Sequence, residues 1–243
     1  MKKLLTLLLV FCGLSMSYGD VTDDEIESYI LRQSNIAFKQ YINSRGTVDV
    51  PVWDEAISSA FNKLITNSGE SSFNAVYAII NDSDFNAGCL PGGQFIINKG
   101  ALDLFDGIIK KQLSSKKGTN ASELREALIA PVIAHELGHY YNKHQFKTFI
   151  KLMELASSSP EKLAYGNIRY SIANEYEADY TGYLLLQKAG YEPDLMLVTL
   201  EIMNIINQES MKGGDINANQ YFLDHPSPHK RLAKFKSGRQ EYH

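Results

Sequence analysis

A short motif in the middle of the chain brings together residue types that can bind a metal ion. It reads His-Glu-x-x-His and is formed by His135, Glu136 and His139. Two histidines four positions apart lie on one face of a helix, so their imidazole nitrogens can reach the same zinc ion. The glutamate lies at the edge of that face and can act on a water molecule without binding the metal itself.

The residues around the motif favour a helix, because apolar side chains recur at helical spacing. These are Leu128, Ile129, Val132, Ile133, Leu137 and Tyr140. The alternative interpretation is a buried helix with two hydrogen-bonded histidines and no metal. Pro131 lacks a backbone donor and either kinks this helix or marks its true start. Asn120 or Ser122 can cap the helix.

A catalytic zinc site needs three protein ligands and an open position, so a third ligand must come from elsewhere in the chain. Glu175 and Asp179 share one helix face and are the best candidates. Glu175 can bind the metal, and Asp179 can accept the N–H of a liganding histidine and so fix its orientation. Glu177 is expected to point elsewhere. The alternative for this segment is an acidic, solvated helix face.

The rest of the chain must supply the scaffold that positions these residues. Its 243 residues are 44% hydrophobic and 21% charged, as expected for one globular domain. The patterns predict helices over residues 22–43, 54–67, 98–106 and 194–208, the first opened by a capping box from Thr22 to Glu25. The last of these is apolar nearly all round and is expected to be buried. Residues 110–120 are expected to form an exposed loop, and residues 210–219 a flexible connector.

A small β-structure is predicted between the helices. Residues 73–80 have strand character, and residues 86–97 indicate two strands joined by a tight turn at Pro91-Gly92-Gly93. The turn belongs either to an ordinary hairpin or to an exposed strand edge that pairs with an extended peptide.

The first nineteen residues resemble an export signal rather than part of the fold. Lys2 and Lys3 precede a short apolar run, and Ser17-Tyr18-Gly19 fits a cleavage site, which gives a mature domain of residues 20–243. Lipidation at Cys12 is the alternative. The expected location is the periplasm, with secretion or a lipid anchor as alternatives, and membrane association is expected only if Cys12 is lipidated.

The mature chain would carry 22 basic and 28 acidic residues, a net charge of −6. No basic stripe remains, which argues against nucleic-acid binding. Cys89 would be the one remaining cysteine, so no internal disulfide is expected.

Four stretches together resemble metallopeptidase family 48, the gluzincin group that includes the protease HtpX, the prenyl-protein endopeptidases and the protease BepA. They are residues 86–93 (Asn-Ala-Gly-Cys-Leu-Pro-Gly-Gly), 135–139 (His-Glu-Leu-Gly-His), 175–179 (Glu-Tyr-Glu-Ala-Asp) and 224–232 (Asp-His-Pro-Ser-Pro-His-Lys-Arg-Leu). The resemblance covers about residues 22–236. It implies a mostly helical α+β catalytic domain with a small sheet or hairpin, whose edge strand flanks a zinc cleft.

The resemblance also implies roles for individual residues. His135, His139 and Glu175 would bind one zinc ion per chain, Glu136 would be the general base and Asp179 would orient His135. The substrate would dock along the strand after Pro91, which gives Gly92, Gly93, Gln94 and Phe95 as substrate-binding residues. Arg231 is a candidate for stabilising the oxyanion. His225 is either a fourth ligand that keeps the enzyme latent or a turn histidine before Pro226.

These features predict a zinc endopeptidase that acts on unfolded or misassembled envelope proteins, with extended or misfolded polypeptides as partners. The alternative is a non-cleaving, chaperone-like module that holds extended chains on a protease fold. Two residues depart from the family pattern: Pro131, just before the motif, and Cys89, which is expected to leave a reactive thiol near the cleft.

Overall fold

The computed structural model describes residues 23–69, 76–115, 120–148, 150–151 and 170–238. Helices dominate, and three short strands form the one sheet of this part of the chain, which confirms the predicted α+β class. The elements in chain order are α2 (Asp23–Arg45), α3 (Pro51–Thr66), β1 (Val76–Ile80), β2 (Ala87–Cys89), β3 (Gln94–Asn98), α4 (Lys99–Ser115), α5 (Ala121–Tyr141), α8 (Ile172–Lys188), α9 (Leu195–Met211), α10 (Asn219–Asp224) and α11 (Pro228–Gly238).

The sheet has the strand order β1-β3-β2. β1 pairs with β3 in parallel, whereas β2 and β3 form the predicted antiparallel hairpin through the Pro91-Gly92-Gly93 turn. Gly93 has a φ of 77°, a conformation that glycine adopts without strain. Because β3 is paired on both sides, the edge position predicted for the strand after Pro91 belongs instead to β2.

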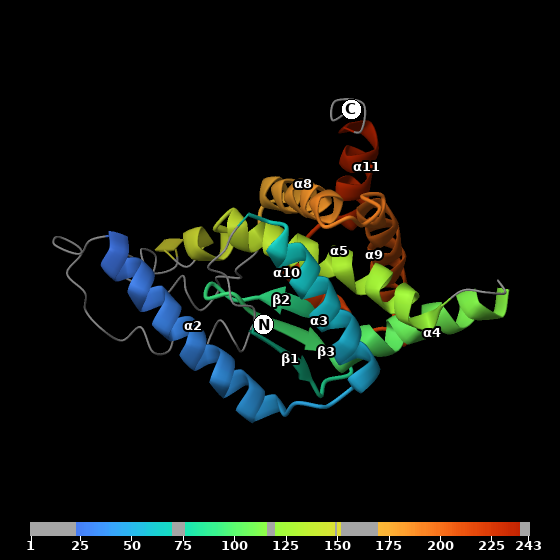
Figure 1. The fold of residues 1–243 in the computed structure, drawn as a ribbon, viewed down its shortest axis with the longest axis horizontal. Helices are drawn as coiled ribbons and strands as arrows, with labels where there is room; N and C mark the ends of the chain where they lie inside the picture. The colour runs from blue at the N-terminus through green and yellow to red at the C-terminus, as the bar shows by residue number, and fades with distance from the viewer. Residues whose placement is uncertain (1–22, 70–75, 116–119, 149, 152–169, 239–243) are drawn as a thin grey trace.

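The sheet is covered by helices on both faces (Figure 1). Alternate side chains of a strand point to opposite faces, and the packing of β3 follows this rule. Ile96 joins a small core with Ile30 and Phe38 of α2. Phe95 and Ile97 face the main core, which is built largely from α3, α4, α5, α8 and α9. This double burial explains why all five residues of β3 are buried.

Several helix boundaries differ from the sequence-based predictions. α3 begins at Pro51 rather than at residue 54, since proline is well tolerated in the first turn of a helix. α4 continues to Ser115, so residues 110–115 are helical rather than part of a loop. The lysines, glutamine and leucine there are good helix formers. The prediction of a loop rested on their polar character and did not weigh this propensity. Thr22, in the predicted capping box, lies outside the described residues.

The helix that carries the His-Glu-x-x-His motif, α5, runs through Pro131 and is capped by Asn120, whose side chain accepts a hydrogen bond from the Ser122 N–H at 2.9 Å. α9 is buried along one face only. Val198 and Ile205 are 44% and 60% exposed, so the prediction of burial nearly all round is wrong for this helix.

Close contact between α5 and α8 depends on small residues at their crossing. A Cβ atom on Gly138 would lie 2.4 Å from the Ala178 carbonyl oxygen, and one on Gly182 would lie 3.0 Å from the Ala134 carbonyl carbon. At Gly138 only glycine fits without moving a helix, and at Gly182 a Cβ would make a tight contact with α5. The crossing therefore holds the start of α8 beside the histidines of α5.

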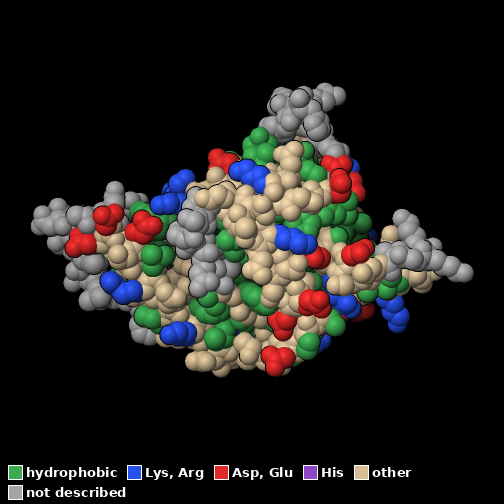
Figure 2. Space-filling view, viewed as in Figure 1, with side chains coloured by type: hydrophobic (Ala, Val, Ile, Leu, Met, Phe, Trp, Pro, Cys, Tyr) green, Lys and Arg blue, Asp and Glu red, His purple; other side chains and the backbone are tan. Residues whose placement is uncertain are grey.

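The face shown in Figure 2 carries Lys and Arg side chains scattered among Asp and Glu side chains rather than gathered into a stripe. None of the helices in the described ranges has the length and apolar character needed to cross a bilayer.

Candidate metal centre

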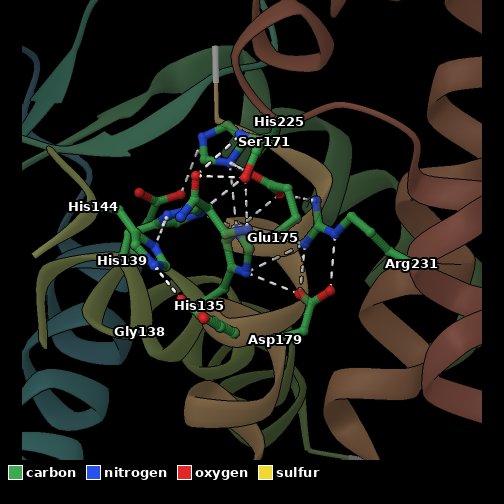
Figure 3. Close-up of polar contacts among 12 residues, drawn as sticks. His135, Gly138, His139, His144, Ser171, Glu175, Asp179, His225 and Arg231 are labelled. Carbon is green, nitrogen blue, oxygen red and sulfur yellow. Dashed lines mark hydrogen bonds and ion pairs between the residues drawn. The ribbon is translucent and has the colours of Figure 1, made fainter. Parts of the chain in front are cut away.

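Four buried side chains from three separate segments converge on one point: His135, His139, Glu175 and His225 (Figure 3). Each offers a ligand atom, and these atoms all lie within 4.8 Å of one another. The two motif histidines direct their Nε2 atoms inward, 3.1 Å apart. His225 Nδ1 lies 3.3 Å from His135 Nε2 and 3.3 Å from Glu175 Oε1.

The local structure explains how each ligand candidate is placed. α5 carries His135 and His139 one turn apart. α8 begins with a capping box in which Ser171 and Asn174 satisfy each other's backbone N–H groups, so Glu175 stands in a well-defined first turn. His225 follows α10, where its N–H donates to the Tyr221 carbonyl at 2.8 Å and its ring stacks on the Tyr221 ring at 4.6 Å.

The donor set fits a divalent transition metal. Glu175 Oε1 is buried and makes no hydrogen bond within the described part of the chain. Its near neighbours are other candidate ligands, since it lies 3.4 Å from His139 Nε2 and 3.3 Å from His225 Nδ1. Buried acceptors that face each other are costly unless a cation lies between them. Imidazole and carboxylate ligands are typical of zinc.

A buried carboxylate fixes the ring of His135. Asp179 Oδ1 lies 2.9 Å from His135 Nδ1, so this nitrogen carries the proton and Nε2 is left bare. Burial raises the pKa of Asp179, but Arg231 and His135 together outweigh burial, and the pKa is lowered overall. Asp179 therefore stays ionised.

Arg231 lies behind the ligand candidates, against two carboxylates of α8. Its guanidinium donates to both oxygens of Asp179, at 2.6 and 2.9 Å, and one of its nitrogens lies 2.7 Å from Glu175 Oε2. Burial raises the pKa of Glu175, but the guanidinium together with His225 and His139 outweighs burial and holds this pKa well below its ordinary value. In this conformation Arg231 anchors α11 to two carboxylates of α8.

Glu136 follows His135 in α5, and its carboxylate also lies beside the converging ligands. Its Oε2 accepts the Cys89 backbone N–H at 3.1 Å, and its Oε1 lies 3.5 Å from His225 Nε2. Burial raises the pKa of Glu136, which makes its carboxylate a better proton acceptor. The edge strand β2 thus touches the predicted base through the backbone of Cys89.

The thiol of Cys89 is not the reactive group that the sequence suggested. Cys89 is buried in the main core, and burial raises its pKa well above the ordinary value. A thiol of this kind stays protonated and is a poor nucleophile.

The four residues predicted to bind substrate take up different positions. The N–H of Gly92 donates to Ser34 Oγ, and Gln94 bonds to Ser34 and Asn35 of α2. Phe95 is 1% exposed in the main core. Gly93 lies in the turn, where its own N–H donates to the Leu90 carbonyl. These contacts tie the segment to α2 and the core.

Three residues near the ligands were missed by the sequence analysis. His144 Nδ1 lies 3.0 Å from His139 Nδ1, and Glu177 Oε2 lies 2.8 Å from His144 Nε2. Glu177 does not join the converging ligands, as predicted, but its largely exposed side chain contacts His144 behind them. Tyr170 stacks on the His139 ring at 3.9 Å. His144 follows the motif by five residues and is the one of the three that the sequence could have flagged.

Comparison with known proteins places the chain among peptidases. The model of the family described as peptidase family M48 matches residues 52–167 and 161–238. Two similar proteins are named mitochondrial metalloendopeptidase OMA1. The Arabidopsis thaliana protein is 28% identical over 63% of this chain and 29% of its own length, and the Schizosaccharomyces pombe protein is 23% identical over 84% of this chain and 59% of its own.

A third similar protein is the β-barrel assembly-enhancing protease of Escherichia coli K12. It is 22% identical over 80% of this chain and 40% of its own length. The chain thus spans between roughly a third and three fifths of the length of these relatives.

Proposed function

Because the chain belongs to peptidase family M48, we propose that it is a zinc-dependent endopeptidase whose centre is formed by His135, His139, Glu175 and Glu136. The observation that carries the proposal is the convergence of two imidazoles and a carboxylate, all buried, with a second carboxylate beside them. Bound there, zinc would supply a Lewis acid that polarises a peptide carbonyl and acidifies water.

The residues of the chain provide the proton transfers. Glu136 has a raised pKa, and in its ionised form it takes a proton from the attacking water. The same carboxyl then gives that proton to the leaving amine of the cleaved peptide. The Cys89 N–H holds Glu136 Oε2 in place, and Oε1 is the oxygen that remains for this exchange.

Substrate is expected to bind as an extended chain along β2, the edge strand that contacts Glu136, once the buried strand has been uncovered. An edge strand offers unpaired backbone groups that a peptide can use as an added strand. Its register would bring the scissile bond toward the general base. Gly92, Gly93, Gln94 and Phe95 would then support this strand from the turn and from β3 instead of pairing with the substrate.

We further propose that the conformation described here is latent. His225 lies where a fourth ligand would fill the open position that catalysis needs. Its displacement would free that position for water and substrate. Arg231, which is paired with Asp179 and Glu175, would serve the ligands in this state rather than an oxyanion.

The natural substrates are proposed to be unfolded or misassembled envelope proteins. This rests on the export-like pattern of residues 1–19 and on the name of the E. coli relative, which concerns β-barrel assembly. Cell fractionation and mass analysis of the N-terminus test it: a periplasmic chain that begins at Asp20 supports export by simple cleavage, a lipidated Cys12 supports a membrane anchor, and an unprocessed cytosolic chain contradicts both.

The decisive experiment compares the purified chain with its Glu136→Gln variant. We expect the wild type to contain about one zinc per chain and to cleave an unfolded protein such as casein, with chelators abolishing cleavage. The variant should retain zinc and lose activity, because glutamine keeps the size of glutamate but cannot accept the proton. Zinc retention with full activity would refute the role of Glu136. Peptide binding without cleavage by the wild type would favour the chaperone-like alternative.

A further inference from the structure

His144 occupies a position that local backbone geometry dictates. α5 ends at Tyr141, and Lys143 then adopts a φ of 55°, which turns the chain sharply before helical structure resumes at residue 144. Asn142 secures this turn, because its side-chain amide donates to the Gly138 carbonyl and to Thr181 of α8. The turn carries His144 back against His139, and its side chain is fully buried there.

The contacts of His144 determine which of its nitrogens carries a proton. Its Nε2 lies 2.8 Å from Glu177 Oε2. An ionised carboxylate can only accept hydrogen bonds, so Nε2 of His144 carries the proton and Nδ1 of the neutral ring is left as an acceptor.

The hydrogen bond from His139 to His144 determines which nitrogen of His139 carries its proton. His139 Nδ1 lies 3.0 Å from the bare Nδ1 of His144, so it must be the donor of that hydrogen bond. The remaining nitrogen of His139, Nε2, is therefore bare and faces the other candidate ligands, 3.1 Å from His135 Nε2. Figure 3 shows His144 behind His139, on the side away from Glu175.

We propose that Glu177 and His144 form a relay that fixes His139 in the metal-binding tautomer, as Asp179 does directly for His135. Both are positioning residues, because neither offers an atom to the metal itself. The inference rests on the proposed zinc centre, but the tautomer of His139 is also a property of the metal-free chain.

Glu177 is the best position for a test, since its side chain is 60% exposed and substitution there leaves the core intact. In Glu177→Gln the amide oxygen can still accept from His144, so we expect zinc affinity close to that of the wild type. In Glu177→Lys the new side chain can only donate, which favours the opposite tautomer of both histidines. We expect its zinc affinity to fall roughly tenfold or more, as for other partners of metal-binding histidines.

His144 supplies a second pair of variants. In His144→Asn the Oδ1 atom can take the place of the imidazole Nδ1 as acceptor, so this variant should retain most of the affinity. In His144→Leu the His139 N–H loses its acceptor, and zinc affinity should fall by about 10- to 100-fold. If His144→Leu does not fold, the Glu177 variants decide the question alone.

The measurements are zinc competition titrations of the full chain against a chelator, and ¹⁵N NMR of its histidine rings without metal. Glu192→Lys, at an exposed loop position, controls for charge reversal, and high salt screens what remains of that effect. We expect Nδ1–H on His139 in the wild type and a shift toward Nε2–H in Glu177→Lys. An unchanged tautomer and affinity in Glu177→Lys, or an equal loss in Glu192→Lys, would overturn the relay. Absence of zinc binding by the wild type would instead refute the proposed centre.

Discussion

At the scale of single residues, the centre combines groups whose charges are set by one another. His225 shows this well, because burial lowers its pKa while the nearby Glu175 and Glu136 raise it more strongly, to about 9. In the metal-free chain His225 is therefore a cation among carboxylates. A metal ion that replaces its proton takes over the same neutralising role.

The charge on His225 predicts how metal-free stability depends on pH. A group with a raised pKa stabilises the fold fully below its unfolded value, near 6.5, and this contribution is lost as the pH rises through 9. The loss amounts to about 3 kcal/mol at most. Urea unfolding of the chelator-treated protein between pH 6 and 10 should therefore show a steeper decline for the wild type than for His225→Asn. Parallel curves for the two proteins would contradict the assignment.

At the scale of elements, the sequence predicted the parts of the site that depend on local spacing. His135 and His139 are one turn apart by the geometry of any helix, and Glu175 and Asp179 follow the same rule. The hairpin at Pro91-Gly92-Gly93 was likewise predictable from its turn residues. These periodicities and the chemistry of the ligands predicted which side chains of α5 and α8 would face one another, but not the crossing that brings the two helices together.

Features that depend on contacts between distant elements were not predictable in the same way. The place of β3 at the centre of the sheet follows from its pairing with β1, which no local pattern encodes. The contact between Glu177 and His144 was missed because His144 reaches Glu177 only through the turn at Lys143. The extension of α4 was missed for a local reason instead. Residues 110–115 have good helix propensity, but they were assigned to a loop because of their charge.

The α5–α8 crossing gives a prediction at this scale. In Gly138→Ala the added methyl group would lie 2.4 Å from the Ala178 carbonyl oxygen, so α8 must shift and move Glu175 away from the histidines. We expect a loss of about 1–3 kcal/mol in the free energy of unfolding, together with weaker zinc binding.

The matched control is Gly107→Ala in α4, where a Cβ meets nothing within 4 Å. There the substitution should stabilise the helix by roughly 0.5–1 kcal/mol. Equal effects of the two substitutions on zinc binding would show that the crossing does not position Glu175.

The contact between α2 and the hairpin turn gives a second prediction for an element. Ser34 is fully buried, donates to Gln94 Oε1 at 2.6 Å and accepts the Gly92 N–H at 2.9 Å. Ser34→Ala leaves both groups unpaired, which should cost about 1–3 kcal/mol of stability by thermal unfolding. Ser28→Ala, at an exposed position of the same helix, should change the melting temperature little. A similar small effect at Ser34 would show that the hydrogen bonds are dispensable.

At the scale of the whole molecule, metal binding and stability must be linked. The ligand candidates join α5, α8 and the segment after α10, so an ion that binds them stabilises only the folded chain. At zinc concentrations about 100 times the dissociation constant, the gain should be about 2.7 kcal/mol.

Thermal unfolding with and without zinc measures this link. The melting temperature should rise with zinc and fall on chelation, whereas Mg²⁺ should have little effect, because it prefers oxygen ligands. Glu175→Ala should remove most of the zinc response. A variant that keeps the full response would exclude Glu175 as a ligand.

The spread of the centre along the chain also bears on its biosynthesis. His135 and His139 leave the ribosome well before Glu175, and His225 and Arg231 emerge last. At a synthesis rate of roughly 5–20 residues per second, the paired imidazoles wait several seconds for their final neighbours. Until residues 225 and 231 have been synthesised, the nascent polypeptide therefore lacks groups that surround the two imidazoles in the folded chain.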